Sequence, residues 1–218
     1  MAKKKSIELL EPILIDTFGL VRLRPPQPNL EDLLSATGEL NEDDEKLLNR
    51  VLIKLIDNAD SWNEEELKMS FISMIIIIAD FDAPIRTYYD REISAEIEGH
   101  FVSSKVDMML SKGIGDLIKT PYFFLHERTA ARYKREKKYS GDPIGQMLGG
   151  MLIGQEKNND NKPIYGCYVQ GRFWFFSIME GKNYVVSQSF DASSVDDVHK
   201  IIFILKKIKI IISERLNS

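Results

Sequence analysis

The chain has 218 residues, 44% of them apolar and 28% charged, with a formal net charge of −4 at pH 7. These values are typical of one large globular domain, or of one domain with an added element, and they exclude a general polyanion-binding protein. The basic start MAKKK is followed by acidic residues where an export signal needs an apolar stretch. The longest apolar run, residues 71–79, is too short to cross a bilayer. With a single cysteine, Cys167, no internal disulfide can form, so we expect a cytoplasmic protein without a membrane partner.

Residues 1–60 are predicted to form a helical extension of the main domain, which would span residues 61–218. Apolar residues recur at helical spacing through residues 44–57, and Asn41 or Asp43 can cap this helix. Three prolines between residues 24 and 32 predict a break before it. The extension carries no chemical motif, which leaves structural support or contact with a partner as its role.

A further helix is predicted after Asn63, a favourable N-cap that is followed by three glutamates in the first turn. Leu67, Phe71 and the apolar residues after them share one face of this helix. Glu64 lies three residues before Leu67, so we expect it at the N-terminal end of the buried face.

Beyond residue 90 the apolar pattern changes to a period of two, which predicts β-strands. Two strands are expected, over residues 91–98 and 101–110, with a turn at Gly99 between them. A second turn is expected over residues 112–116.

The continuous apolar run 121–127 predicts a strand in the middle of a sheet. Glu127 ends this strand, and we expect it to face Asp107 of the strand before. His126 should point away from Glu127, because successive side chains alternate across a strand, and it is assigned to packing.

The next helix is predicted to begin at Asp142 and Pro143, which suit the N-cap and the first helical position. Its three glycines disfavour a helix and therefore predict close packing against a neighbouring sheet; they lie at positions 149, 150 and 154.

A meander of strands is predicted to follow, over residues 164–170, 173–179 and 184–190. Ser194 and Asp197 resemble a capping box that opens a C-terminal helix. Together these elements predict an α/β fold with an N-terminal helical extension and a C-terminal meander plus helix.

Four polar side chains occur on these elements in the order helix, strand, strand, helix; they are Glu64, Asp107, Glu127 and Gln146. Carboxylates at neighbouring strand ends supply the oxygen ligands that Mg²⁺ or Mn²⁺ prefers, and such an ion can activate water and stabilise a leaving oxygen. Taken singly, each residue also has a structural role open to it, such as facing water, ending a strand or complementing a helix dipole.

The stretches around these residues resemble the PD-(D/E)XK nuclease superfamily, and most closely the stand-alone domains similar to the N-terminal nuclease part of type I restriction subunits. The resemblance covers about residues 62–157 and is carried by NEEELKMSFISMI, KVDMML, FFLHE and QMLGGML. It implies a restriction-endonuclease-like mixed central sheet flanked by helices, and Mg²⁺-dependent cleavage of DNA phosphodiesters. It also implies Asp107 and Glu127 as metal ligands, Glu64 as the helix acid and Gln146 as the glutamine of the following helix.

The sequence departs from this family two residues after the second acid, where the motif has a lysine and this chain has Thr129. If residues 128–132, RTAAR, are an insertion, Glu127 is followed by Tyr133 and Lys134, which restores an acid-x-lysine order. Lys134 is therefore the candidate for assisting the attacking water.

Residues 128–141 contain six cations and one glutamate, which would attract a nearby phosphate. The resulting candidates for nucleic-acid contact are Arg128, Arg132, Lys134 and Arg135. A solvated basic loop is the alternative.

Three functions remain open from the sequence. The first is a Mg²⁺-dependent nuclease acting on DNA. The second is the same fold with degraded catalysis that still binds nucleic acid, which Thr129 favours. The third is a protein-interaction domain or homo-oligomer, for which the meander offers aromatic side chains at Tyr165, Tyr168, Phe173 and Trp174.

Overall fold

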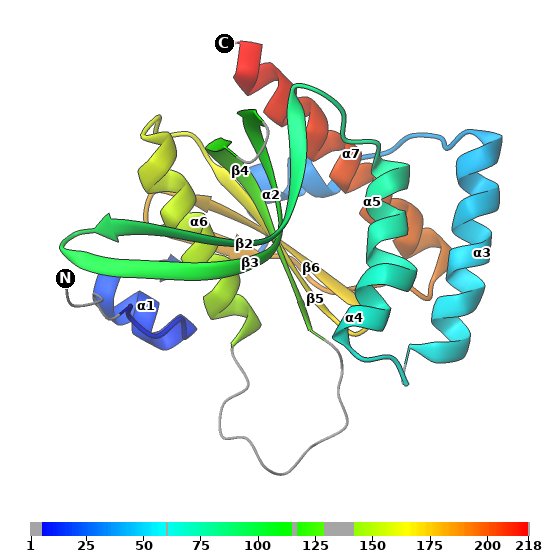
Figure 1. Ribbon diagram of the computed structural model, residues 1–218, viewed down its shortest axis with the longest axis horizontal. Coiled ribbons are helices and arrows are strands. Elements are labelled where there is room, and N and C mark those ends of the chain that lie inside the picture. Colours follow the sequence, from blue (N-terminus) through cyan, green and yellow to red (C-terminus); the bar gives the residue numbers. More distant parts are fainter. Residues whose placement is uncertain (1–5, 60, 115–116, 129–141, 218) are drawn as a thin grey trace.

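The computed structural model describes residues 6–59, 61–114, 117–128 and 142–217. Inside these ranges, some side chains are outside the description, namely those of residues 113, 114, 117, 119–122, 127, 128 and 217. The described residues form an eight-stranded mixed sheet with helices on both faces (Figure 1). The predicted α/β class is therefore confirmed.

The strands follow one another across the sheet in the order β1-β7-β6-β5-β4-β3-β2, with β8 beside β6. Their bounds are Val21–Arg22 (β1), Ile85–Ile97 (β2), His100–Ile114 (β3), Leu117–Arg128 (β4), Ile164–Gln170 (β5), Phe173–Glu180 (β6), Asn183–Val186 (β7) and Phe190–Asp191 (β8). β2, β3 and β4 are antiparallel neighbours, whereas β5 is parallel to β4. A parallel neighbour needs a crossover connection, and helix α6 (Pro143–Asn158) provides it.

The helices divide between the two faces of the sheet (Figure 1). One face is covered by α6 and α1 (Glu11–Phe18). The other is covered by α2 (Pro28–Leu34), α3 (Glu42–Asn58), α4 (Glu64–Leu67), η1 (Lys68–Ile72), α5 (Ser73–Ala79) and α7 (Val195–Asn217). Within the described ranges, no helix is long and apolar enough to cross a membrane.

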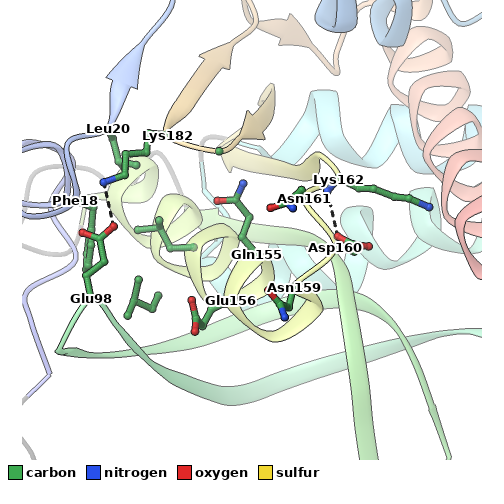
Figure 2. A pocket seen from close by; sticks show the side chains of 13 residues that line it. Phe18, Leu20, Glu98, Gln155, Glu156, Asn159, Asp160, Asn161, Lys162 and Lys182 are labelled. Atoms are coloured by element: carbon green, nitrogen blue, oxygen red, sulfur yellow. Dashed lines mark hydrogen bonds and ion pairs between the residues drawn. The ribbon is translucent and has the colours of Figure 1, made fainter.

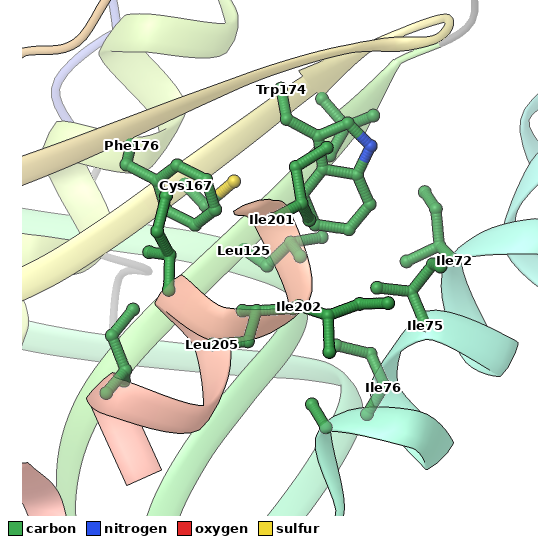
Figure 3. Close-up of a cluster of buried hydrophobic side chains, with 14 of the residues drawn as sticks. Ile72, Ile75, Ile76, Leu125, Cys167, Trp174, Phe176, Ile201, Ile202 and Leu205 are labelled. Carbon is green, nitrogen blue, oxygen red and sulfur yellow. The ribbon is translucent and has the colours of Figure 1, made fainter. Parts of the chain in front are cut away.

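Each face of the sheet has its own apolar core. Figure 3 shows part of the larger one, where side chains of α5 and α7 meet strand residues that include Leu125, Cys167 and Trp174. All three are buried, and burial raises the pKa of the Cys167 thiol. Apolar burial of about 25 cal/mol per Å² makes these two cores the main stabilising contribution to the fold.

Three predicted N-caps are confirmed by their side-chain hydrogen bonds. Asn41 accepts from the backbone N–H of Asp44 at 2.8 Å, and Asp142 accepts from that of Ile144 at 3.0 Å. Asn63 accepts from the N–H of Glu66 at 2.9 Å, and Glu66 returns the bond to complete a capping box. These caps satisfy backbone groups that the first helical turn leaves without partners.

The predicted hairpin turn is confirmed, but both of its strands are longer than expected. Glu98 and Gly99 form the turn with φ of 48° and 81°, as a tight antiparallel hairpin requires. β3 continues to Ile114, so most of the turn predicted at residues 112–116 belongs to a strand. Pairing with β4 extends β3 there, which the local glycines did not indicate.

Three other elements differ from the prediction. Pro28 begins α2 instead of only interrupting a helix, because a proline at the first helical position has no N–H to satisfy. The last predicted meander strand is divided into β7 and β8. Asp197 accepts from the N–H of Asp191 at 2.8 Å, so the capping box expected with Ser194 is only half formed.

The glycines of α6 allow close packing, as predicted, but not all of it against the sheet. A Cβ atom at Gly154 would lie 2.7 Å from the ring of Phe124 in β4. A Cβ at Gly149 would instead lie 2.8 Å from Leu9, because the segment before α1 crosses this part of α6. The N-terminal residues therefore contribute to packing around the start of α6.

Candidate functional site

The four candidate residues of the sequence lie on the helix, hairpin and crossover around β3 and β4. Glu64 is the first residue of α4 and is exposed, and Gln146 is half-buried in the first turn of α6. Asp107 lies in β3 with 28% of its side chain exposed. Glu127 is the penultimate residue of the adjacent strand β4, and its side chain lies outside the described residues.

The candidate nucleic-acid residues fall mostly beyond the description. Arg128 is described only by its backbone, as the last residue of β4. Arg132, Lys134 and Arg135 lie outside the described residues altogether.

The alternation of side chains between the two faces of the sheet is broken in β3 at Asp107. Met108 packs into the core beneath α5 and α7, whereas Val106 packs into the core beneath α6. Residues two apart in a regular strand share a face, so a regular strand would place both in the same core. Asp107 therefore occupies the position where the alternation is broken.

The partner strand is irregular at the same place. The β2–β3 register continues unchanged from Tyr89↔Met108 to Arg91↔Val106, which places Asp90 opposite Asp107. Asp90 has a φ of 51°, which is uncommon for a residue other than glycine. Backbone outliers of this kind cost free energy and are concentrated at functional sites.

Two lysines approach Asp90 from different elements. Lys68 Nζ of η1 lies 3.3 Å from Asp90 Oδ1, and Lys105 Nζ of β3 lies 3.8 Å from the same oxygen. The Lys68 side chain is 12% exposed, whereas that of Lys105 is 71% exposed. Packing therefore restrains Lys68 much more than Lys105.

The charge of Lys68 also acts on the neighbouring phenol. Burial raises the pKa of Tyr89, and the ammonium of Lys68 opposes part of that rise because it favours the phenolate. Lys68 is thus close enough to influence two successive residues of β2.

His126 is buried, as its assignment to packing predicts, and it also lies beside Asp107. Its Nδ1 lies 3.5 Å from Asp107 Oδ2, and its side chain is 1% exposed. Its Nε2 is buried with no hydrogen-bond partner among the described residues. The pairing of Met108 with Leu125 places the next residues of the two strands, Asp107 and His126, beside each other.

The helix that carries Glu64 and Lys68 contains a π-helical turn, η1, between α4 and α5. The turn begins at Lys68, and the hydroxyl of Ser73 donates to the Lys68 carbonyl oxygen at 2.6 Å. π-Helical turns inside α-helices are rare and occur frequently at functional sites. No sequence pattern considered above predicted it.

The described carboxylates can supply only part of a metal site. Within the described residues, no group of three or more histidine, cysteine, aspartate or glutamate side chains is arranged to hold a metal ion. Asp107 and Asp90 both offer partly exposed carboxylate oxygens, the ligands that Mg²⁺ and Mn²⁺ prefer. A Mg²⁺ ion keeps several waters, so one further carboxylate would suffice, and Glu127 is the predicted source.

A separate pocket of about 390 Å³ lies at the other end of α6 (Figure 2). Leu152 and Gln155 line it from α6, and the ion pair between Lys182 Nζ and Glu98 Oε1, at 3.0 Å, lies at its edge. Gln146 is in the first turn of the same helix, so this pocket is distinct from the candidate site.

The aromatic residues of the meander mostly belong to the core. Trp174 is fully buried, Tyr168 is 7% exposed, and Phe173 is 38% exposed. Burial raises the pKa of Tyr168 to about 12. Of the four candidate contacts, Phe173 therefore offers the largest apolar surface to a partner.

Sequence comparison adds no relative to this description. The chain matches no family model and no curated protein.

Two residues near the candidate site, Lys68 and Asp90, were missed by sequence reasoning, and the contact of the buried His126 with Asp107 was not predicted. Lys68 lies four residues after Glu64, and that spacing places both on one face of a helix, which was a usable signal. Asp90 lay just before the predicted strand and carried no signal of its own.

Proposed function

We propose that this chain is a metal-dependent nuclease of the PD-(D/E)XK type with a restriction-endonuclease-like fold, and that it hydrolyses phosphodiester bonds of DNA. Asp107 and Glu127 would hold Mg²⁺ or Mn²⁺, with Glu64 as a further acid and Gln146 on the following helix. The proposal includes a cytoplasmic location, which the single cysteine supports.

The order of the elements supports this proposal. A helix with Glu64, strands with Asp107 and Glu127, and a crossover helix with Gln146 follow one another around β3 and β4. This is the order of helix, strand, strand and helix on which the sequence resemblance rests, within a mixed sheet that has helices on both faces.

The observation that carries the proposal is the coincident irregularity of β2 and β3 at Asp90 and Asp107. Asp90 and Asp107 lie opposite each other where the backbone of β2 has a positive φ and β3 changes face, and like charges opposite each other are destabilising. A divalent cation bound at Asp107 would add to the compensation that Lys68 and Lys105 already give to the charge of Asp90. It would also lower the pKa of a bound water and stabilise the leaving oxygen.

The reaction would add the oxygen of one water molecule to phosphorus and break one P–O ester bond. One hydrogen of the water ends on the departing alcohol and the other on the new phosphate monoester. A nearby lysine ammonium would stabilise the negative charge on the phosphate oxygens as the new bond forms.

The test is cleavage of plasmid, linear duplex and single-stranded DNA by the purified chain in Mg²⁺ or Mn²⁺. We expect Asp107→Asn and Glu127→Gln each to lower the cleavage rate at least about 100-fold, because each removes a ligand charge. Glu42→Gln, on the far helix α3, is the control and should cut like the wild type. Wild-type protein that leaves every substrate intact in both metals would contradict the proposal.

A second candidate function is a nuclease-like module that binds nucleic acid, or a protein partner, without cutting. Thr129, at the position where the family motif has a lysine, favours it. In that case the wild type should bind DNA with an affinity that falls as salt rises, and should not cleave it. Joint neutralisation of Arg132, Lys134 and Arg135 should then abolish the binding.

A further inference from the structure

We infer that Lys68 supplies the ammonium group of the candidate site, in place of a lysine at position 129. This inference rests on the proposed function and deepens it, because it assigns the phosphate-contacting lysine to the helix before the hairpin. A lysine directly after Glu127, or one among the basic residues 128–141, is then not needed for that role.

The position of Lys68 on its helix directs it to the site. Lys68 lies four residues after Glu64, so the two share one helical face. The π-helical turn η1 begins at Lys68 and changes the direction of the side chains that follow it. The low exposure of the Lys68 side chain, 12%, means that it is held against the sheet instead of moving freely in water.

Lys68 contacts Asp90, which lies opposite Asp107 on the neighbouring strand. Lys68 Nζ lies 3.3 Å from Asp90 Oδ1, and Asp90 lies opposite Asp107, between the pairs Tyr89↔Met108 and Arg91↔Val106. Paired strands lie about 4.8 Å apart, so an ammonium held by one strand can reach a ligand bound at the next. A phosphate near Asp107 would therefore lie within reach of Lys68.

The other lysine at Asp90 is less suited to this role. Lys105 is 71% exposed and its Nζ lies 3.8 Å from the same Asp90 oxygen. A group that must stabilise a developing charge is more effective when packing has already positioned it. Lys105 would then contribute to general attraction of the nucleic acid.

The test measures DNA affinity in Ca²⁺ and DNA cleavage in Mg²⁺ for Lys68→Met, Lys68→Gln and Lys68→Arg. The matched control is Lys209→Met, because Lys209 of α7 is similarly covered, at 22% exposure, and is paired with Asp80 and Asp82. Affinity is measured at several salt concentrations, and circular dichroism verifies the fold of each variant.

We expect Lys68→Met and Lys68→Gln to cut at least about 100-fold more slowly than the wild type, as loss of one stabilising group at a reacting centre typically does. Their log affinity should fall with log salt less steeply, by about one unit of slope, because one phosphate contact is lost. Lys68→Arg should keep the wild-type salt slope, and Lys209→Met should match the wild type in both measurements.

The remaining outcomes show whether this inference, the proposed function or both are wrong. Cleavage by both neutral Lys68 variants within about threefold of the wild type would overturn the inference and leave the nuclease intact. If the wild type binds DNA without cutting it, the nuclease proposal fails, and the salt slope of the neutral variants alone decides the role of Lys68. Wild-type protein that neither binds nor cuts DNA would overturn both.

Discussion

The imidazole Nδ1 of His126 lies 3.5 Å from the carboxylate Oδ2 of Asp107, at the point where β3 changes the face that it presents. His126 is 1% exposed, so it holds a fixed position beneath the partly exposed carboxylate. If Asp107 binds a metal ion, as the proposed function has it, a buried partner of this kind would orient its carboxylate and raise the metal affinity.

The contact between His126 and Asp107 predicts a difference between two substitutions. His126→Asn keeps a side-chain nitrogen close to the position of Nδ1, whereas His126→Leu keeps volume but has no side-chain nitrogen. We expect His126→Leu to bind Mn²⁺ about 10-fold or more weakly than His126→Asn, as is typical when the partner of a metal ligand is removed. Calorimetric titration with Mn²⁺ measures this, and equal affinities in the two variants would refute the positioning role.

Asp142 is predicted to link the N-terminal segment to α6. Its Oδ1 accepts from the N–H of Ile144 at 3.0 Å, and its Oδ2 accepts from the N–H of Glu11 at 2.7 Å. Asp142→Ala should lower the free energy of unfolding by about 1–2 kcal/mol, because it removes both acceptors. Asp142→Asn, which keeps one acceptor oxygen, should lose less in the same urea titration. The prediction fails if the alanine variant is as stable as the wild type.

Gly145 and Gly150 of α6 are predicted to respond differently to alanine. Helix propensity alone would favour alanine at either position by about 1 kcal/mol. A Cβ at Gly145 would lie 2.8 Å from backbone atoms of Leu10 and Glu11, which cannot move independently of the chain. We expect Gly145→Ala to lose about 1–3 kcal/mol of stability through this overpacking.

The control for that prediction is Gly150→Ala. Its Cβ would lie 3.2 Å from the ring of Phe124, and small movements of the ring can relieve the contact. Thermal unfolding of Gly150→Ala should therefore stay within about 1 kcal/mol of the wild type, because the propensity gain offsets the contact. Equal losses for the two variants would be inconsistent with the backbone clash.

His199 is predicted to make stability depend on pH. Burial alone would lower the pKa of His199, but its hydrogen bonds to the Val195 carbonyl oxygen, at 2.7 Å, and to Glu45, at 2.9 Å, outweigh this effect. The net result is a pKa above the ordinary value of 6.5. The charged form is thus favoured in the folded chain, and its stabilisation is complete below the unfolded pKa and lost as pH rises through the folded pKa.

Glu45→Gln provides the measurement. The difference in unfolding free energy between the wild type and this variant should be largest near about pH 5.5 and should shrink toward about pH 8.5. Glu42→Gln is the control, because Glu42 pairs with Lys46, at 2.6 Å, which keeps its charge throughout this range. A Glu45→Gln difference that is constant with pH would contradict the role of His199.

Local sequence signals predicted the elements that local physics controls. Asn63 and Asp142 cap their helices because short polar side chains satisfy the first backbone N–H groups, whatever the rest of the fold does. Gly99 marks the hairpin because it adopts a positive φ without strain. The same signals could not predict β1, whose two residues are strand only because β7 lies beside them.

The sequence by itself determined the α/β class, the order of helix, hairpin, strand and crossover helix, and the candidate acids Glu64, Asp107 and Glu127 on those elements. Only the tertiary structure decided which side chains meet at Asp107. His126 meets Asp107 because the β3–β4 register, which pairs Met108 with Leu125, brings the two side by side, and Lys68 reaches Asp90 from η1. The positions of these contacts, and of the irregularity of β2 and β3 at Asp90 and Asp107, depend on pairing between strands and on packing against two different cores, which no local pattern encodes.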